Sequence, residues 1–316
     1  MKHGSYIFNP PQEHPHHYSK SQQENLTPVA FAIQNGSMKW LFIFDLTPGW
    51  TREEIEFSIN TIRKVLNARI ANESFRNSMR QAELIQQSLL PKGPIEFAGF
   101  EIAGDSISTD IVGGDLFDFI HFDDDHFGIA VGDSSGHGLP AALLVRDVVT
   151  GLRMGLEKEM KITPVLEKLN RVIHRSTLST AFISLFYGEI EANGNVVYTN
   201  AGHPPPILFS GEHIEMLDLG GLVLGPMPEV KLRRGFARMN PGNVLVMYSD
   251  GLIERQNRYG IQFELDRVKK IVIDHQHRSA ENIKDILIES AFNYGEKGSW
   301  KDDVTVVVVK RKPETA

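Results

Sequence analysis

The spacing of apolar side chains changes along the chain and divides it into three regions. Residues 1–26 are polar and contain three prolines and four histidines. Such a composition cannot bury enough apolar surface to order itself, so we expect a disordered tail. Two short apolar runs follow, PVAFAIQNG and KWLFIFDL, and Asn35-Gly36 between them is a turn typical of β-hairpins. A strand pair is therefore predicted at the start of the second region, residues 27–90.

The rest of this second region has helical periodicity. No proline or glycine occurs from Thr51 to Leu90, and Thr51 with Glu54 forms the sequence of a capping box. Apolar residues recur every three or four positions at Ile55, Ile59, Ile62, Leu66 and Ile70. A helix this long needs a partner for its apolar face, so we expect a homodimer through residues 51–90 or a missing sensor partner. The alternative is that the helix folds against its own chain.

From residue 91 to residue 316 the pattern becomes one of short β-type runs interrupted by helices. Two helical stretches begin near Pro140 and Pro164, and two more precede the last strand, VTVVVVKR. Hairpin-like successive strands and paired helices favour an α+β domain with largely antiparallel sheets over a parallel, Rossmann-like one.

Candidate chemistry lies in the segment GGDLFDFIHFDDDHFGIAVGDSSG. If Asp123, Asp124 and Asp125 form the tip of a hairpin, Asp115 lies directly opposite Asp133. Opposed side chains have Cβ atoms roughly 5 Å apart, and like charges there are destabilising. Because no Lys or Arg lies in these strands, a divalent cation is the simplest counter-charge, and carboxylates suit Mg²⁺ or Mn²⁺ better than zinc.

Further acids stand next to apolar strands in the same region. Asp250 follows VLVMYS, and Asp302 and Asp303 precede VTVVVV. Glycines near Asp133 allow close approach of the backbone, so the Ser134 carbonyl is a candidate oxygen ligand. His137 is a candidate general acid because imidazole titrates near neutrality, or else a loop histidine that bonds to backbone. The start of the helix near Pro140 offers positive potential to a phosphate group.

Composition and charge narrow the class of protein. The chain has 316 residues, 41% of them hydrophobic, with 33 Lys and Arg against 40 Asp and Glu and no basic block, so we expect no nucleic-acid partner. The absence of cysteine excludes disulfides, thiolate ligands and cysteine nucleophiles. No apolar run is long enough to span a bilayer, which predicts a cytoplasmic protein without a membrane partner.

Several motifs occur together in one order: GGDLFDF, VGDSSGHGLPAAL, STAFISLFYGEI, YTNAGHPPP, MYSDGLIE and KDDVTVVVV. This series resembles the SpoIIE-type branch of the metal-dependent, protein phosphatase 2C-like serine/threonine phosphatases, over roughly residues 90–311. The resemblance implies an antiparallel β-sandwich flanked by helices in αββα layers, with two Mn²⁺ or Mg²⁺ ions at one edge.

By motif, the resemblance implies metal ligation by Asp115, Asp133, the Ser134 carbonyl, Asp250 and Asp302, and leaves the part of Asp303 open. It implies hydrolysis of phosphoserine or phosphothreonine on a bacterial regulatory protein, a STAS-type anti-sigma-factor antagonist, by a metal-activated water. Two other functions stay open from the residues alone: a catalytically silent module that binds phosphoproteins, and a hydrolase for a small phosphorylated metabolite.

Overall fold

The computed structural model describes residues 5–7, 27–35, 38–47, 49–156, 161–176, 181–296, 298 and 300–313. The chain forms two compact units, Met1–Arg80 and Gln81–Ala316. Helix α1 (Arg52–Gln87) contains the division between them, which falls before the boundary predicted at residue 90. Among the described residues, no helix has an apolar stretch long enough to cross a membrane.

The first unit contains a three-stranded antiparallel sheet in the order β1-β2-β3. Its strands are β1 (Ser5–Ile7), β2 (Thr27–Asn35) and β3 (Met38–Leu46). The predicted hairpin is confirmed, with Asn35 directly opposite Met38. Strand β1 differs from the disordered tail expected over residues 1–26, because it pairs with β2 and its Ile7 packs against the apolar side chains of this unit. The four histidines of that segment lie outside the described residues.

Helix α1 begins with the predicted capping box. The Thr51 backbone N–H donates to Glu54 Oε2 at 2.8 Å, and the Glu54 N–H donates to Thr51 Oγ1 at 3.3 Å. Most of the predicted apolar stripe packs against the β2–β3 sheet of the same chain, with Ile55 and Ile59 buried and Ile62 45% exposed. For this stripe, the alternative of a helix folded on its own chain is therefore what the structure shows.

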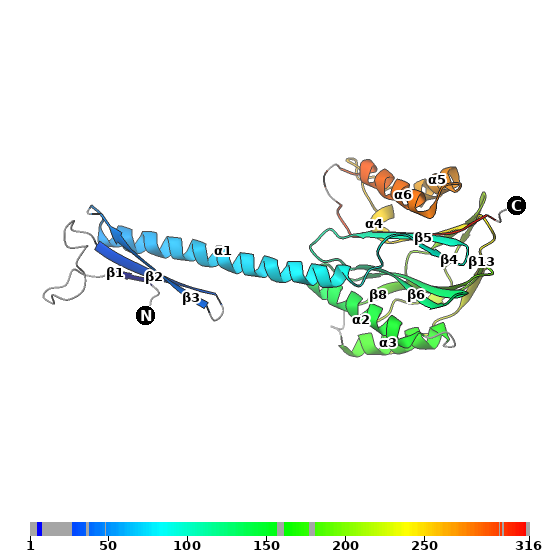
Figure 1. Ribbon diagram of the computed structural model, residues 1–316, viewed down its shortest axis with the longest axis horizontal. Coiled ribbons are helices and arrows are strands. Elements are labelled where there is room, and N and C mark those ends of the chain that lie inside the picture. The colour runs from blue at the N-terminus through cyan, green and yellow to red at the C-terminus, as the bar shows by residue number, and fades with distance from the viewer. Residues whose placement is uncertain are drawn as a thin grey trace. The chain divides into compact units, whose positions relative to one another are not determined.

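The second unit is a sandwich of two sheets, drawn edge-on in Figure 1. One sheet has the order β11-β10-β14-β15-β5-β4: β11 (His213–Met216), β10 (Ile207–Ser210), β14 (Val244–Tyr248), β15 (Val304–Arg311), β5 (Phe100–Ile107) and β4 (Ile95–Phe97). The other has the order β12-β9-β8-β7-β6, with β13 also paired to β9: β12 (Gly220–Gly221), β9 (Asn195–Ala201), β8 (Ile183–Glu191), β7 (His126–Ser134), β6 (Asp115–Asp123) and β13 (Gly235–Arg238). Every pairing is antiparallel except β12 with β9.

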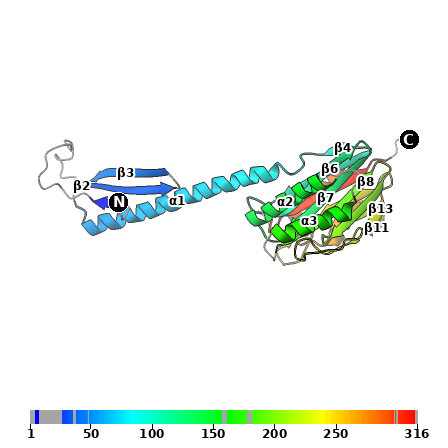
Figure 2. The same cartoon turned by 90° about the horizontal axis from the view of Figure 1, so that it is seen from below.

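Helices cover both outer faces of the sandwich (Figure 1), and Figure 2 looks onto the face that carries α2 and α3. One face carries α2 (Leu139–Gly155) and α3 (Ile162–Ser176), and the other carries α5 (Leu265–His275) and α6 (Ala280–Tyr294). Three apolar layers result, one between the two sheets and one beneath each helix pair. The expected α+β class and αββα layering are confirmed.

The β6–β7 hairpin has the predicted register along most of its length. Asp115 lies opposite Asp133, and Phe117 opposite Val131. The prediction is wrong at the tip, because the register shifts between His121 and Asp123, and Asp123 lies opposite His126. This bulge absorbs the extra residue and shortens the turn to Asp124-Asp125.

Candidate metal centre

Asp115 and Asp133 lie side by side where β6 begins and β7 ends. Asp115 is only 3% exposed, and burial, together with the negative charge of Asp133, raises the pKa of its carboxyl well above the ordinary range. Burial also raises the pKa of Asp133 to about 7, with repulsion from Asp250, Asp302 and Asp303 adding to the effect. Two carboxyl groups that resist ionisation next to each other need a positive counter-charge to be fully ionised at neutral pH.

Asp250 and Asp302 lie at the ends of two strands of the other sheet. Asp250 follows β14 and begins the short helix α4 (Asp250–Ile253), which the sequence did not predict, and Asp302 precedes β15. Burial raises the pKa of Asp250, and the neighbouring carboxylate of Asp302 raises it further. Both acids line an open cavity of about 510 Å³ together with Asp133 and Ser134. The fold thus collects acids from two sheets at one margin of the sandwich.

Glycine allows the close backbone approach expected near these acids. A Cβ atom on Gly114 would lie 3.1 Å from the Ser134 carbonyl oxygen and 3.4 Å from Asp133 Oδ1. The Ser134 backbone N–H donates to the Gly114 carbonyl at 3.0 Å, which fixes the two segments together. Ser134 is buried beside Asp133, consistent with the expectation that its backbone oxygen adjoins the acids.

Ser249 connects the buried carboxylate to the opposite sheet, a role that the sequence analysis missed. Its hydroxyl donates to Asp115 Oδ2 at 2.7 Å and accepts the Thr305 backbone N–H at 2.9 Å. The other oxygen of Asp115, Oδ1, is buried and makes no hydrogen bond with the described residues. One carboxylate oxygen is thus held in place while the other is left without a donor.

Asp303 makes hydrogen bonds that brace a loop. Its Oδ1 accepts the Thr109 backbone N–H at 2.7 Å and the Thr109 hydroxyl at 3.1 Å, and its Oδ2 accepts the Gly114 N–H at 2.6 Å. These bonds occupy both oxygens of a side chain that is 8% exposed. Asp303 therefore has a different role from its neighbour Asp302: it binds the loop, whereas Asp302 lines the cavity.

Gln86, near the end of α1, is a second residue that the sequence analysis missed. Its side-chain amide donates to the Gly113 carbonyl at 2.6 Å and accepts the Gly113 N–H at 2.9 Å. Gly113 is two residues before Asp115, so this two-point contact positions the segment that leads into the buried acid. The sequence gives no sign of this contact, because a hydrogen bond from a glutamine to a backbone group far along the chain follows no sequence pattern.

His137 is not brought into the acid cluster by any contact between described residues. Its side chain is 87% exposed, and its Nδ1 lies 3.1 Å from Oδ2 of Asp110, whose side chain is 57% exposed. It follows β7 and precedes α2, and Gly138 at the start of that helix has φ of 70°. The predicted helix start near Pro140 is confirmed.

Hydrogen bonds within the NAGHPPP loop hold it in a fixed conformation. The Asn200 side chain accepts the His203 N–H at 2.7 Å and donates to the His203 carbonyl at 2.9 Å. His203 Nδ1 lies 2.9 Å from the Ser184 hydroxyl, beside the strand that carries Asp133. Burial lowers the pKa of His203 to about 3, so the ring is neutral.

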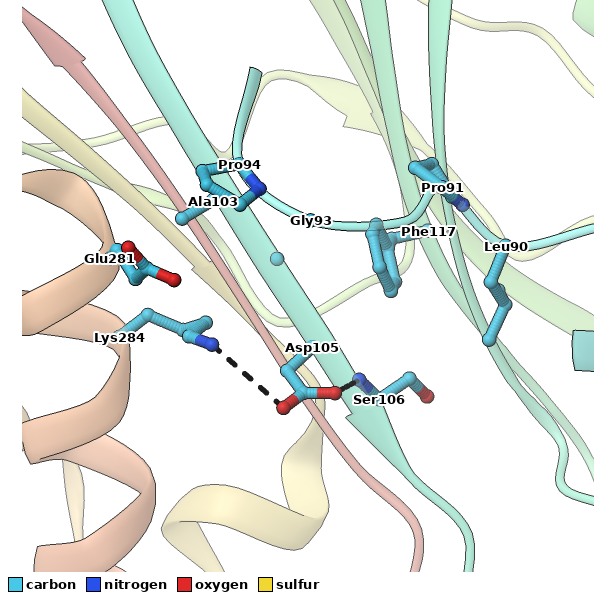
Figure 3. A pocket seen from close by; sticks show the side chains of 11 residues that line it. Leu90, Pro91, Gly93, Pro94, Ala103, Asp105, Ser106, Phe117, Glu281 and Lys284 are labelled. Atoms are coloured by element: carbon cyan, nitrogen blue, oxygen red, sulfur yellow. Dashed lines mark hydrogen bonds and ion pairs between the residues drawn. The ribbon is translucent and has the colours of Figure 1, made fainter.

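A separate hollow of about 250 Å³ lies between β5, α6 and the segment after α1 (Figure 3). Lys284 points into it but is paired with Asp285 at 2.9 Å and Asp105 at 3.8 Å. None of the predicted metal-binding acids lines this hollow. We therefore assign the candidate site to the cavity bordered by Asp133, Asp250 and Asp302.

Comparison with known proteins identifies the family. The Stage II sporulation protein E (SpoIIE) family matches residues 123–312, more than half of the chain. The chain belongs to the SpoIIE family. It is similar to phosphoserine phosphatase RsbU of Bacillus subtilis, with 28% identity over 62% of this chain and 59% of RsbU. The chain therefore spans about three fifths of the length of that relative.

Solved structures give the fold of the SpoIIE family. The SiaA-PP2C domain of Pseudomonas aeruginosa superposes with a TM-score of 0.65 at 20% identity, over 76% of this chain and 98% of that domain. RsbX in complex with magnesium has a TM-score of 0.53 at 19% identity, over 68% of this chain and 97% of RsbX. These two likenesses establish a protein phosphatase 2C-like fold for the larger part of the chain.

The acidic residues gathered at this margin of the sandwich have the chemistry of a divalent cation site. All the candidate donors are oxygens, which Mg²⁺ and Mn²⁺ prefer, and the orphaned Asp115 Oδ1 and the raised pKa values of three acids indicate missing positive charge. Among the described residues, however, no three acid or histidine side chains converge closely enough to hold an ion as they stand. Carboxylate rotation would have to complete the coordination.

Proposed function

We propose that this SpoIIE-family chain is a metal-dependent protein serine/threonine phosphatase that hydrolyses phosphoserine or phosphothreonine. The observation that supports this most directly is the pairing of Asp115 with Asp133 beside the cavity that Asp250 and Asp302 also line. The naming of RsbU as a phosphoserine phosphatase agrees with this assignment.

The residues proposed to hold two Mn²⁺ or Mg²⁺ ions are Asp115, Asp133, the Ser134 carbonyl, Asp250 and Asp302. Bound in pairs, such ions lower the pKa of a water to near neutrality and offset charge on phosphoryl oxygens. The chain's own contribution is to collect the acids and fix their orientation through Ser249. The open cavity then admits a phosphorylated side chain from a protein, rather than enclosing a small metabolite.

His137 is proposed as the proton donor to the departing serine or threonine oxygen. The Asp110 carboxylate at 3.1 Å would orient the ring on its exposed loop. An alkoxide needs a proton as it leaves, whereas p-nitrophenolate is a stable anion and does not. His137→Gln should therefore slow turnover of a phosphoserine peptide but leave p-nitrophenyl phosphate turnover close to wild type. Equal loss on both substrates would contradict the role of a proton donor.

We propose a phosphorylated STAS-type anti-sigma-factor antagonist in the cytoplasm as the substrate, as the resemblance of the sequence motifs implies. We also retain the homodimer expected through the region 51–90, although the sheet of the first unit covers most of the stripe that suggested it. The side chains of α1 still exposed include Phe57 and Val65.

The decisive experiment is phosphate release from phosphorylated STAS-type proteins, with and without Mn²⁺. Release that requires Mn²⁺ and exceeds release from small phosphorylated metabolites is the expected result. A chain that binds the phosphoprotein but releases no phosphate would be a binding module, and a preference for metabolites would overturn the protein-substrate assignment.

A further inference from the structure

Strand β3 forms the outer edge of the sheet in the first unit. In the order β1-β2-β3 it pairs with β2 on one side, and no strand among the described residues pairs with the other. It is nine residues long and contains no proline, and its charged residues, Lys39 and Asp45, lie near its ends. Edge strands usually carry charges, prolines or bulges that discourage pairing, and the middle of β3 has none of them.

The side chains of β3 are apolar on both faces of the sheet. Trp40 and Phe42 are 39% and 43% exposed on the face that carries α1, and Leu41 and Ile43 are 49% and 64% exposed on the other. Four consecutive large apolar residues at an open edge are unusual on a free surface. A further strand alongside β3 would cover both rows at once.

The backbone of β3 determines which registers such a strand can use. Met38 closes the two-residue hairpin opposite Asn35, so alternate residues from Met38 onward direct their N–H and C=O groups towards β2. The residues between them direct theirs to the open edge: Lys39, Leu41, Ile43 and Asp45. In an antiparallel partner, these residues must face residues that are also directed outwards.

A second copy of β3 satisfies this condition over its whole length. When two copies run antiparallel with Phe42 opposite Phe42, Lys39 of each faces Asp45 of the other, and Leu41 faces Ile43. Trp40 then faces Phe44 on the opposite side of the sheet. Within its own chain Lys39 lies opposite Gln34 and Asp45 opposite Pro28, and neither makes an ion pair with the described residues. The register that pairs β3 over its whole length therefore also pairs the charges.

We propose that two copies of this chain associate through β3, forming one continuous six-stranded sheet with its two-fold axis at Phe42. This surface lies in strand β3, outside residues 51–90, so it is separate from the α1 surface that the sequence pattern indicated. It does not depend on the phosphatase chemistry, so each can fail without the other.

A cysteine cross-link tests the register in the full chain, which contains no native cysteine. Opposed residues in a non-hydrogen-bonded antiparallel pair have Cα atoms about 4.5 Å apart, within the range of a disulfide. Phe42→Cys should therefore form a disulfide-linked dimer under mild oxidation. Met38→Cys is the matched control, because Met38 would face Leu46 and lie roughly 27 Å from its own copy. Linkage at position 42 no faster than at position 38 would overturn the proposal.

Charge reversal tests the same surface without replacing an apolar residue. Lys39→Asp or Asp45→Lys alone creates two like-charge pairs across the axis and should weaken dimerisation about 10-fold, measured by analytical ultracentrifugation. The double variant K39D/D45K restores both pairs and should recover the wild-type dissociation constant. A monomeric wild type at tens of micromolar, or a double variant weaker than either single one, would overturn the proposal that β3 pairs with its own copy.

Discussion

Asp133 is a proposed metal ligand, and its carboxyl group is costly to ionise in the free protein. Replacing it by Asn removes one proposed ligand but keeps the shape of the side chain. Loss of a mere outer-shell partner at a metal site typically costs about 10- to 100-fold, so Asp133→Asn should reduce Mn²⁺-dependent turnover by more than about 100-fold. Full Mn²⁺-dependent turnover in this variant would refute the assignment of Asp133.

The same variant has a second readout that does not depend on activity. The folded pKa of Asp133 is about 7, above the ordinary value of 3.8, so its contribution to stability is present at low pH and is lost as pH rises through 7. In EDTA, Asp133→Asn should therefore raise the melting temperature at pH 8 relative to wild type, and less so at pH 5. Equal changes in melting temperature at both pH values would contradict a raised pKa of Asp133.

His203 gives the opposite sign of pH dependence. Its folded pKa is about 3 and its ordinary pKa 6.5, so its contribution is complete above 6.5 and declines as pH falls towards 3. At about 1.4 kcal/mol per pKa unit, wild type should lose about 2–3 kcal/mol more than His203→Gln between pH 7.5 and 4.5. Urea unfolding in EDTA measures this difference, with the exposed His213→Gln on β11 as the control.

At the scale of elements, the end of α1 holds the loop that precedes β6. Gln86→Ala leaves the buried N–H and C=O of Gly113 without their partner, which typically costs about 1–3 kcal/mol. The variant should therefore be less stable and bind Mn²⁺ more weakly, by thermal unfolding and calorimetric titration. Gln87→Ala is the matched control, since Gln87 is exposed and bonds only within the helix, to Glu83.

The sequence was most informative where a regular period determines position. Alternation along β6 and β7 placed Asp115 opposite Asp133, because each strand residue fixes the face of the next. The hairpin tip was predicted wrongly, because a single bulged residue has no period of its own. Ser249, Gln86 and the bracing role of Asp303 were missed for a similar reason, since each bonds to a partner that only the tertiary fold brings near.

The surface that covers α1 is another feature that the sequence pattern could not predict. The stripe from Ile55 to Ile70 was correctly predicted as apolar, but periodicity does not say which surface covers it. The β2–β3 sheet does so within the chain, and large apolar side chains remain exposed on β3 as well as on α1.

At the scale of the whole molecule, the division into Met1–Arg80 and Gln81–Ala316 predicts separable functions. All the proposed metal ligands and Gln86 belong to the second unit, and β3 belongs to the first. A chain limited to residues 81–316 should retain Mn²⁺-dependent hydrolysis of p-nitrophenyl phosphate but sediment as a monomer. An inactive but folded 81–316, judged by circular dichroism, would show that the first unit completes the catalytic site.

The Ser249 hydroxyl touches both halves of the sandwich at once, through Asp115 on one sheet and Thr305 on the other. Any sliding of one sheet over the other would break this junction and turn the buried acid away from its neighbours. Cation uptake should consequently slow amide hydrogen exchange along β6 and β15 together, although these strands lie in different sheets. The bound ion would then hold the two sheets against each other, and its loss would let the sheets separate locally before the chain unfolds.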